Sequence, residues 1–155
     1  MGSVQFEANN PRNHFIRHFA FQGELTRKNG PKDDFNFTIV PRGRGRVSLR
    51  SVNFPKRFLR HRDFRIRLEE PAGSGDTLFA LDSTFFREPG LADPDNPRAV
   101  SFRSVNFPDR FLRHRDFSLF LEPEDSPNLA ADATFLQENT PVIIDHGSEG
   151  VPADD

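Results

Sequence analysis

The sequence carries one fourteen-residue phrase twice. Residues 51–64 read SVNFPKRFLRHRDF and residues 104–117 read SVNFPDRFLRHRDF, so the two copies differ only where Asp109 replaces Lys56. Extended to twenty residues, the copies keep fifteen identities at a constant offset of 53 residues. A period of this length is typical of a fold built from a repeated supersecondary unit. The function is therefore expected in something that the chain does more than once.

A third, more diverged copy precedes these two. Residues 13–18 read NHFIRH, and the FIRH within them matches the FLRH of both later copies. A strand-like segment stands upstream in every copy: VQF at 4–6, VSL at 47–49 and VSF at 100–102. An aspartate stands three residues before a phenylalanine downstream in every copy: Asp34, Asp82 and Asp132. We therefore predict three repeats, at about residues 2–41, 45–96 and 98–145.

The pattern inside each repeat predicts strands. Apolar and polar residues alternate at period two, as in RIRL at residues 65–68 and SLFL at residues 118–121, which suits strands with one buried face. Clusters of Pro, Gly, Asn and Asp mark the turns between them. No segment has the pattern of a long amphipathic helix. Three copies of a unit of about four short strands predict an all-β fold, a β-trefoil with approximate threefold symmetry.

Length and charge limit the other possibilities. The 155 residues fit one domain, which we place at residues 1–145, and the acidic tail at 146–155 is expected to be disordered. A net charge of -2 gives no basic excess that would indicate nucleic acid or an anionic membrane as partner. The sequence has no apolar run long enough for a membrane helix and does not begin with a signal peptide. We expect a monomer.

Three residue types are absent from the chain: Cys, Tyr and Trp. There is no cysteine, which excludes disulfides and thiolate chemistry. There are eighteen Phe residues but no Tyr and no Trp, whereas β-rich chains normally use all three aromatics. One hypothesis is that Tyr and Trp were replaced by Phe through engineering, and the alternative is a natural bias.

The large apolar residues that recur between copies are interpreted as core, because such side chains supply most of the burial energy. These are Phe58, Leu59, Phe64, Phe85, Phe111, Leu112, Phe117 and Phe135. The recurring polar residues cannot be explained in this way. They are His61 and His114, Asp82 and Asp132, and Asn53 and Asn106.

The recurring polar residues allow two interpretations. In the structural one, the aspartates cap turns and the histidines make hydrogen bonds that support the fold. In the functional one, each repeat forms a small polar pocket for a sugar. A carboxylate and an imidazole would hold neighbouring hydroxyls as acceptor and donor, and Phe54 or Phe107 would cover the apolar face of the sugar ring.

The chain resembles a known family over about residues 4–140. SVNFPxRFLRHRDF in two copies, LDSTFF, ADATFL and IRHFAFQGELT are similar to the arabinofuranose-binding module of α-L-arabinofuranosidases, the AbfB domain or carbohydrate-binding module family 42. The resemblance implies a β-trefoil with up to one shallow pocket per lobe, for arabinofuranosyl side chains of arabinoxylan or arabinan. It also implies an extracellular location, no cofactor and no catalysis, because catalysis in this family lies in a separate domain.

The resemblance also assigns residues to the pockets. The histidines would be His18, His61 and His114, the carboxylates Asp34, Asp82 and Asp132, and the aromatic walls Phe54 and Phe107. Pro11 stands where the first repeat would have its aromatic wall, which puts the first pocket in question. Where relatives carry Tyr at the wall, Phe keeps the stacking face and loses a hydroxyl.

The sequence leaves three alternative functions open. A glycosidase would need two carboxylates around one bond, and each later repeat offers one recurring Asp together with Glu69 or Glu122, which we expect in turns. A zinc site would form if threefold symmetry brought the three histidines of the repeats together on the axis. A stable trefoil scaffold with degenerate pockets is the third alternative.

Overall fold

The computed structural model describes residues 2–139, so the predicted disordered tail at 146–155 lies outside the described residues. Each repeat contributes four strands to this part of the chain. The first repeat holds β1 (Val4–Ala8), β2 (Phe15–Phe19), β3 (Gln22–Thr26) and β4 (Phe37–Gly43). The second holds β5 (Arg46–Ser51), β6 (Phe58–Arg62), β7 (Arg65–Glu69) and β8 (Phe85–Pro89). The third holds β9 (Ala99–Ser104), β10 (Arg110–Arg115), β11 (Ser118–Pro123) and β12 (Phe135–Asn139).

One short helical segment precedes the last strand of every repeat. The segments are η1 (Lys32–Phe35), α1 (Thr77–Asp82) and α2 (Leu129–Asp132). None is a long amphipathic helix, as the sequence predicted, and each contains the recurring aspartate of its repeat. The segments therefore fix the backbone position of three equivalent carboxylates. No helix among residues 2–139 combines the length and the apolar character needed to cross a membrane.

The first and last strands of the repeats close into a barrel. Antiparallel pairing runs from β1 to β4, β5, β8, β9 and β12 and then back to β1. In the closing pair, Val4 lies opposite Asn139 and Ala8 opposite Phe135. Because the ring closes on itself, no barrel strand is left with an unpaired edge.

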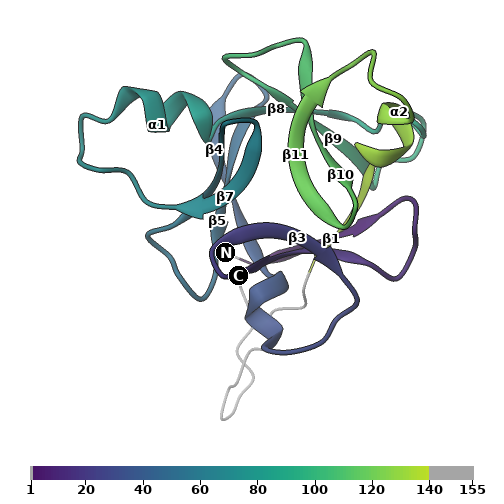
Figure 1. Ribbon diagram of the computed structural model, residues 1–155, viewed down its shortest axis with the longest axis horizontal. Coiled ribbons are helices and arrows are strands. Elements are labelled where there is room, and N and C mark those ends of the chain that lie inside the picture. Colours follow the sequence, from purple (N-terminus) through teal and green to yellow (C-terminus); the bar gives the residue numbers. More distant parts are fainter. Residues whose placement is uncertain (1, 140–155) are drawn as a thin grey trace, which may run out of the picture.

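The two middle strands of each repeat form a hairpin, and the three hairpins together cap the barrel (Figure 1). The hairpins pair with one another through β3 and β7, β7 and β11, and β11 and β3. Gly23 leaves room at the centre of this cap, since an added Cβ would lie 3.0 Å from both Ile66 and Leu119. A six-stranded barrel with a three-hairpin cap is a β-trefoil, so the predicted fold is confirmed.

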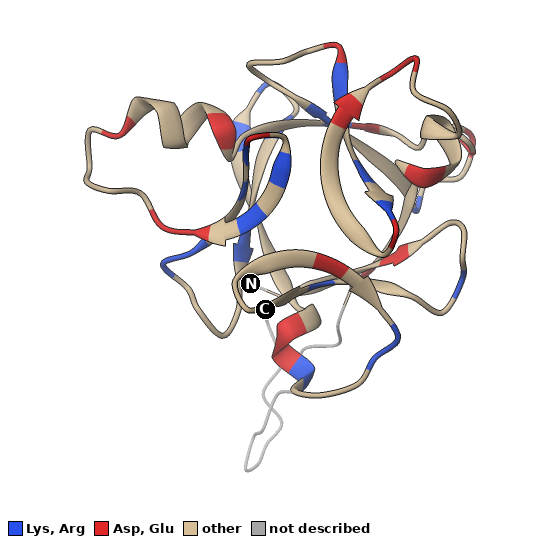
Figure 2. Ribbon diagram, viewed as in Figure 1, with Lys and Arg blue, Asp and Glu red and all other residues tan. Residues whose placement is uncertain are grey.

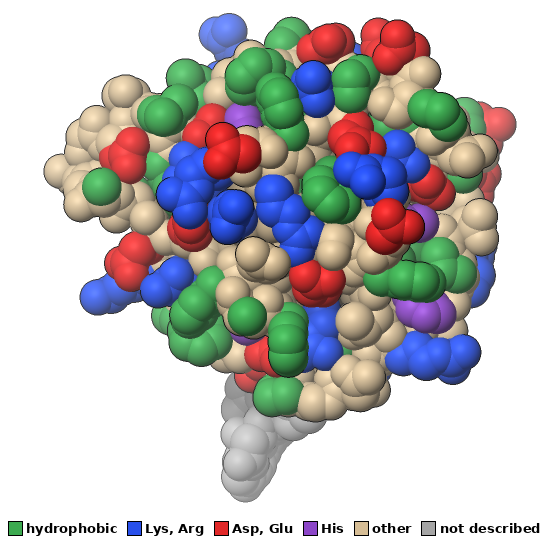
Figure 3. All heavy atoms as spheres, in the orientation of Figure 1, with side chains coloured by type: hydrophobic (Ala, Val, Ile, Leu, Met, Phe, Trp, Pro, Cys, Tyr) green, Lys and Arg blue, Asp and Glu red, His purple; other side chains and the backbone are tan. Residues whose placement is uncertain are grey.

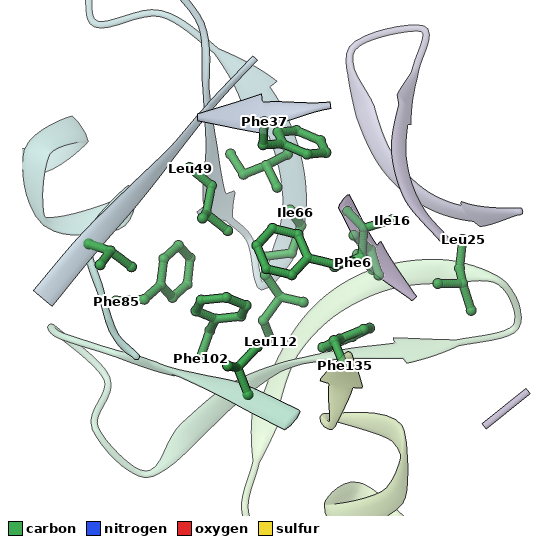
Figure 4. Close-up of a cluster of buried hydrophobic side chains, with 14 of the residues drawn as sticks. Phe6, Ile16, Leu25, Phe37, Leu49, Ile66, Phe85, Phe102, Leu112 and Phe135 are labelled. Atoms are coloured by element: carbon green, nitrogen blue, oxygen red, sulfur yellow. The ribbon is translucent and has the colours of Figure 1, made fainter. Parts of the chain in front are cut away.

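The core fills the barrel with equivalent residues from the three repeats (Figure 4). Two sets of equivalent residues contribute, Phe6, Leu49 and Phe102 from the first strands of the repeats and Phe37, Phe85 and Phe135 from the last, all of them fully buried. Burying one such side chain contributes about 1.5–3 kcal/mol. Equivalent core residues therefore recur along the sequence with the repeat period of about 50 residues.

The predicted core is right for five of its eight residues: Leu59, Phe85, Phe111, Leu112 and Phe135 are buried. Phe58 and Phe64 are half-buried, and Phe117 was predicted wrongly, because 54% of it is exposed. Phe64 and Phe117 lie at the tips of their hairpins with φ angles of 60° and 63°. Phe64 still packs against the core, so the turn position alone does not decide whether a tip residue is buried.

The charged side chains are interspersed on the surface. Figure 2 places basic residues on strands of the cap and acidic residues on the short helical segments, and on the face shown in Figure 3 both signs alternate. Several of these form ion pairs across a hairpin, such as Arg62 with Glu69 at 2.7 Å and Arg115 with Glu122 at 2.7 Å.

The burial difference between two phenylalanines of the third repeat gives the first prediction. Phe111→Ala should lower the free energy of unfolding by about 3–5 kcal/mol, since its ring is 1% exposed. Phe117→Ala serves as the matched control and should cost less than about 1 kcal/mol. Urea denaturation of both variants measures the costs. Equal costs would contradict the description of the hairpin tips.

Candidate functional site

The recurring polar residues lie where one repeat meets the next. We name the three contacts seam one (first repeat with second), seam two (second with third) and seam three (third with first). The hairpin tip of each repeat crosses its seam. Phe21 accepts a hydrogen bond from the Leu68 backbone at 2.8 Å, Phe64 from Leu121 at 2.8 Å, and Phe117 from Leu25 at 2.9 Å.

Seam one holds a cluster built from both repeats. His18 and Asp34 come from the first repeat, and Asn53 and Phe54 from the second. The Asn53 amide is 2.9 Å from His18 Nε2 through its oxygen and donates to Asp34 Oδ1 at 2.9 Å through its nitrogen. Arg17 donates to Asp34 Oδ2 at 2.9 Å. The Phe54 ring stands edge-on to His18, with 5.5 Å between ring centroids.

Seam two repeats this arrangement. The Asn106 amide lies 2.9 Å from His61 Nε2 and donates to Asp82 Oδ1 at 2.9 Å. Arg60 pairs with Asp82 Oδ2, and the Phe107 ring stands edge-on to His61 at 5.4 Å. The equivalence of the two clusters, down to which atom bonds which, follows from the repeated sequence.

Seam three has the same charged residues without the amide. Arg113 pairs with Asp132 Oδ2, and His114 Nε2 lies 3.7 Å from Asp132 Oδ1. His114 Nε2 is buried and has no hydrogen-bond partner in the described chain. A buried polar atom without a partner is rare in folded proteins and points to a group that binds there.

A cavity opens at seam three. It measures about 670 Å³ and its lining includes His114, Asp132, Phe117, Arg113 and Pro11. This volume is within the range of about 300–1,000 Å³ typical of pockets for small molecules. His114 and Asp132 offer nitrogen and oxygen atoms to polar groups, and the exposed Phe117 offers an aromatic face.

Aromatic and cationic side chains close the other two seams. At seam one, Phe21 packs on Phe54 at 5.2 Å and the Arg57 guanidinium lies 3.9 Å from the Phe21 ring centre. At seam two, Phe64 packs on Phe107 at 5.3 Å and Arg110 lies 3.7 Å from the centre of the Phe64 ring.

At seam three, the position aligned with Arg57 and Arg110 is His14, whose ring is 5.5 Å from that of Phe117. The smaller side chains Pro11 and His14 thus replace a phenylalanine and an arginine here. This exchange of large for small side chains accounts for the open cavity.

Burial governs the charge of His114. Removal from water lowers the pKa of its imidazole below the ordinary value of 6.5. The Asp132 carboxylate and the backbone of Asn10 act in the opposite direction, whereas the charges of Arg113 and His14 also lower the pKa. The ring is therefore neutral at neutral pH, with one nitrogen able to donate a hydrogen bond and the other able to accept one.

The structure corrects how the predicted residues group. We expected Phe54 to serve the pocket of His61, and Phe107 that of His114, all within one repeat. Instead each phenylalanine packs on the histidine of the preceding repeat, Phe54 on His18 and Phe107 on His61. The sequence alignment identified equivalent residues, but it could not show that each pocket is shared between two repeats.

Pro11 was expected to remove the aromatic wall of the first pocket, but the structure places it at another one. Pro11 lines the cavity of seam three, whereas the wall beside His18 is Phe54. The proline affects the pocket of His114 and Asp132. It does not remove the wall of the first one.

Two sets of cluster residues were missing from the predicted site. Asn53 and Asn106 recur but were not assigned to a pocket, and Arg17, Arg60 and Arg113, each of which directly precedes a histidine, were not assigned to one either. Their recurrence beside a histidine was the signal that could have found them. The arginines hold the aspartates, and the asparagines connect the repeats.

The structural interpretation of the aspartates as turn caps is wrong. Asp82 accepts hydrogen bonds from the side chains of Arg60 and Asn106, and Asp132 accepts from Arg113. The carboxylates are thus engaged by side chains of the clusters, and their geometry depends on the seams between repeats.

The positions of the histidines and glutamates do not match those expected for a zinc site or a glycosidase. The three histidines lie at three separate seams, and no group of three or more His, Asp or Glu side chains within residues 2–139 is placed to hold a metal ion. Glu69 and Glu122 were expected in turns but lie in β7 and β11. They pair with Arg60 at 3.2 Å and with Arg113 at 3.0 Å, so they serve the clusters as counter-charges.

Comparison with known proteins agrees with the geometry. The profile of the alpha-L-arabinofuranosidase B (ABFB) domain matches residues 31–137. Alpha-L-arabinofuranosidase B of Emericella nidulans is 30% identical over 103 residues, which are 66% of this chain and 19% of that protein. The chain therefore spans about a fifth of the curated relative that it matches.

Solved structures share the fold at lower identity. An arabinofuranosidase complexed with arabinofuranosyl-alpha-1,2-xylobiose is 22% identical with a TM-score of 0.73, and the match covers 88% of this chain and 31% of that one. The designed threefold-symmetric protein ThreeFoil is 7% identical with a TM-score of 0.68, and the match covers 88% of this chain and 98% of that one.

The lowered pKa of His114 predicts how stability depends on pH. Because the folded-state pKa lies below 6.5, the unfolded chain binds the proton more tightly. The stabilisation is fully present above pH 6.5 and is lost as the pH falls through 6.5 towards the folded-state pKa. We expect Tm to fall between about pH 7.5 and about pH 5.5. His114→Gln should reduce this fall, and an unchanged slope in that variant would contradict the assignment.

Proposed function

Since the chain belongs to the alpha-L-arabinofuranosidase B (AbfB) domain family, we propose that it is a non-catalytic module that binds arabinofuranosyl side chains of arabinoxylan or arabinan. The chain would act as a monomer outside the cell, where such polysaccharides occur. The similar solved structure that carries arabinofuranosyl-xylobiose supports this class of ligand. A whole relative is several times longer than this chain, so any catalytic activity attached to the module is a separate matter.

The cavity at seam three is the observation that carries the proposal. Buried His114 Nε2 lacks a partner, and Asp132 Oδ1 lies 3.7 Å from it, so two neighbouring sugar hydroxyls can bind one group each. A hydroxyl donates to the carboxylate and either donates to or accepts from the neutral imidazole. Phe117 and Pro11 supply apolar surface for the ring of the sugar.

The clusters at seams one and two are candidates of the same kind. His18 with Asp34 and His61 with Asp82 repeat the donor and acceptor, and Phe54 and Phe107 are 40% and 39% exposed. Phenylalanine provides the face for stacking without the hydroxyl of a tyrosine. The three clusters therefore share one chemistry, which suits a ligand that recurs along a branched polysaccharide.

The arrangement favours binding over hydrolysis. A glycosidase places two carboxyl groups on either side of one bond, with one of them available as a proton donor. Three carboxylates line the cavity at seam three. Asp132 pairs with Arg113, and Glu122 pairs with Arg113 and Arg115, whereas Asp116 is 91% exposed and lies 3.9 Å from Arg115. Such pairing holds Asp132 and Glu122 in place as hydrogen-bond acceptors.

Affinity electrophoresis tests the proposal. The protein should be retarded in a native gel that contains arabinoxylan, because several arabinofuranosyl branches lie within reach of each molecule as it migrates. The matched control is a gel with the same xylan after enzymatic removal of its arabinofuranosyl groups, in which retardation should be lost. Equal mobility in the two gels would contradict the proposal and would favour a trefoil scaffold with degenerate pockets.

A further inference from the structure

We propose that Asn53 and Asn106 are internal occupants of the sugar sites at seams one and two, so that seam three is the principal site for ligand. This inference rests on the proposed function and goes further, because it ranks the three sites and names the residues that set the ranking. Seam three, between the last and the first repeat, then differs from the other two in having, within residues 2–139, no amide between its histidine and its aspartate.

The asparagine amide makes the contacts that a pair of hydroxyls would make. At seam two, Asn106 Oδ1 lies 2.9 Å from His61 Nε2, and Asn106 Nδ2 donates to Asp82 Oδ1 at 2.9 Å. Two adjacent polar groups on one planar unit thus bridge the imidazole and the carboxylate. A vicinal diol offers two adjacent polar groups in the same way, so both compete for the same two atoms.

A serine holds each of these asparagines in place. Ser104 Oγ donates to Asn106 Oδ1 at 3.0 Å and accepts from the Phe107 backbone at 3.0 Å. The equivalent contacts at seam one, from Ser51 to Asn53 and from Phe54 to Ser51, also measure 3.0 Å. The Ser-Val-Asn-Phe segment therefore fixes the amide before any ligand arrives.

The first repeat lacks this support. Ala8 stands where the other copies have Ser51 and Ser104, so no hydroxyl is available to anchor the amide of Asn10. His114 Nε2 is left without a hydrogen-bond partner among the described residues. The cavity is lined by His114 and Asp132, the equivalents of the residues that the amide bridges at seams one and two. The change from serine to alanine at this position thus accompanies the exchanges at Pro11 and His14 that open the cavity.

The two kinds of seam should differ in affinity. A sugar at seam three gains a hydrogen bond to His114 Nε2, which has no partner in the described part of the chain, whereas at seams one and two it must first displace an amide. The loss of one or two net hydrogen bonds weakens binding by about tenfold or more. Ligand at seam three would also connect the third repeat to the first, as the asparagines connect the others.

Nuclear magnetic resonance can follow each seam separately. The ring signals of His18, His61 and His114 report seams one, two and three, and each is assigned by its His→Gln variant. The probe is methyl α-L-arabinofuranoside. In the unaltered protein, the His114 signals should shift at concentrations about tenfold or more below those needed to shift the His61 signals. Asp132→Ala should abolish the His114 response.

Removing the internal occupant should create a second strong site. In Asn106→Ala, the His61 signals should respond at concentrations close to those that move His114. Ser104→Ala releases the same amide with less change to the seam and should act in the same direction, which covers the case that Asn106→Ala does not fold. Gln137→Ala, which removes the hydrogen bonds between Arg87 and Gln137 on β8 and β12, is the matched control and should leave the ranking unchanged.

The outcomes separate the two proposals. If the probe and arabinoxylan bind to no form of the protein, the proposed function fails. If the probe binds but moves His61 and His114 at the same concentrations in the unaltered protein, the ranking fails while the function stands. The ranking also fails if folded Asn106→Ala and Ser104→Ala leave the His61 response as weak as before.

Discussion

Each repeat presents groups that only the next repeat can satisfy, and the rest of the structure depends on this constraint. The tip carbonyls of Phe21, Phe64 and Phe117 each accept a backbone hydrogen bond from the following repeat. The Asp–His pairs of the first two repeats likewise obtain their amide partner from the following repeat. A single repeat would therefore expose apolar strand faces and unpaired polar atoms, and three are needed to close the barrel.

The sequence predicted the fold because the core positions follow its period. Phe6, Leu49 and Phe102 recur in equivalent places and meet in one core, so a pattern along the chain becomes a contact in space. Burial of hairpin-tip residues could not be predicted in this way. Phe117 lies in the same kind of turn as half-buried Phe64, with φ angles of 63° and 60°. Phe64 is covered by Phe107, whereas Pro11 takes that place at seam three, which explains why Phe117 is exposed.

The candidate site was predicted in its chemistry but not in its geometry. His61 and Asp82 were identified because they recur and because hydrophobicity could not explain them. Their aromatic partner was assigned to the wrong repeat, since alignment compares copies and carries no information on how neighbouring copies pack. Phe107 reaches His61 only because the loop after β9 lies against the second repeat.

The same cluster can stabilise the fold or bind a ligand, depending on whether the protein satisfies it. Buried charges such as Asp82 and Arg60 are costly to desolvate, and a complete set of partners offsets that cost. Asn106 completes the set at seam two, and the cluster there joins two repeats. At seam three, His114 Nε2 remains unsatisfied, which costs stability in the free protein. A ligand hydroxyl that bonds to this nitrogen removes that cost, so the seam whose polar cluster is incomplete is the one whose cluster a ligand can complete.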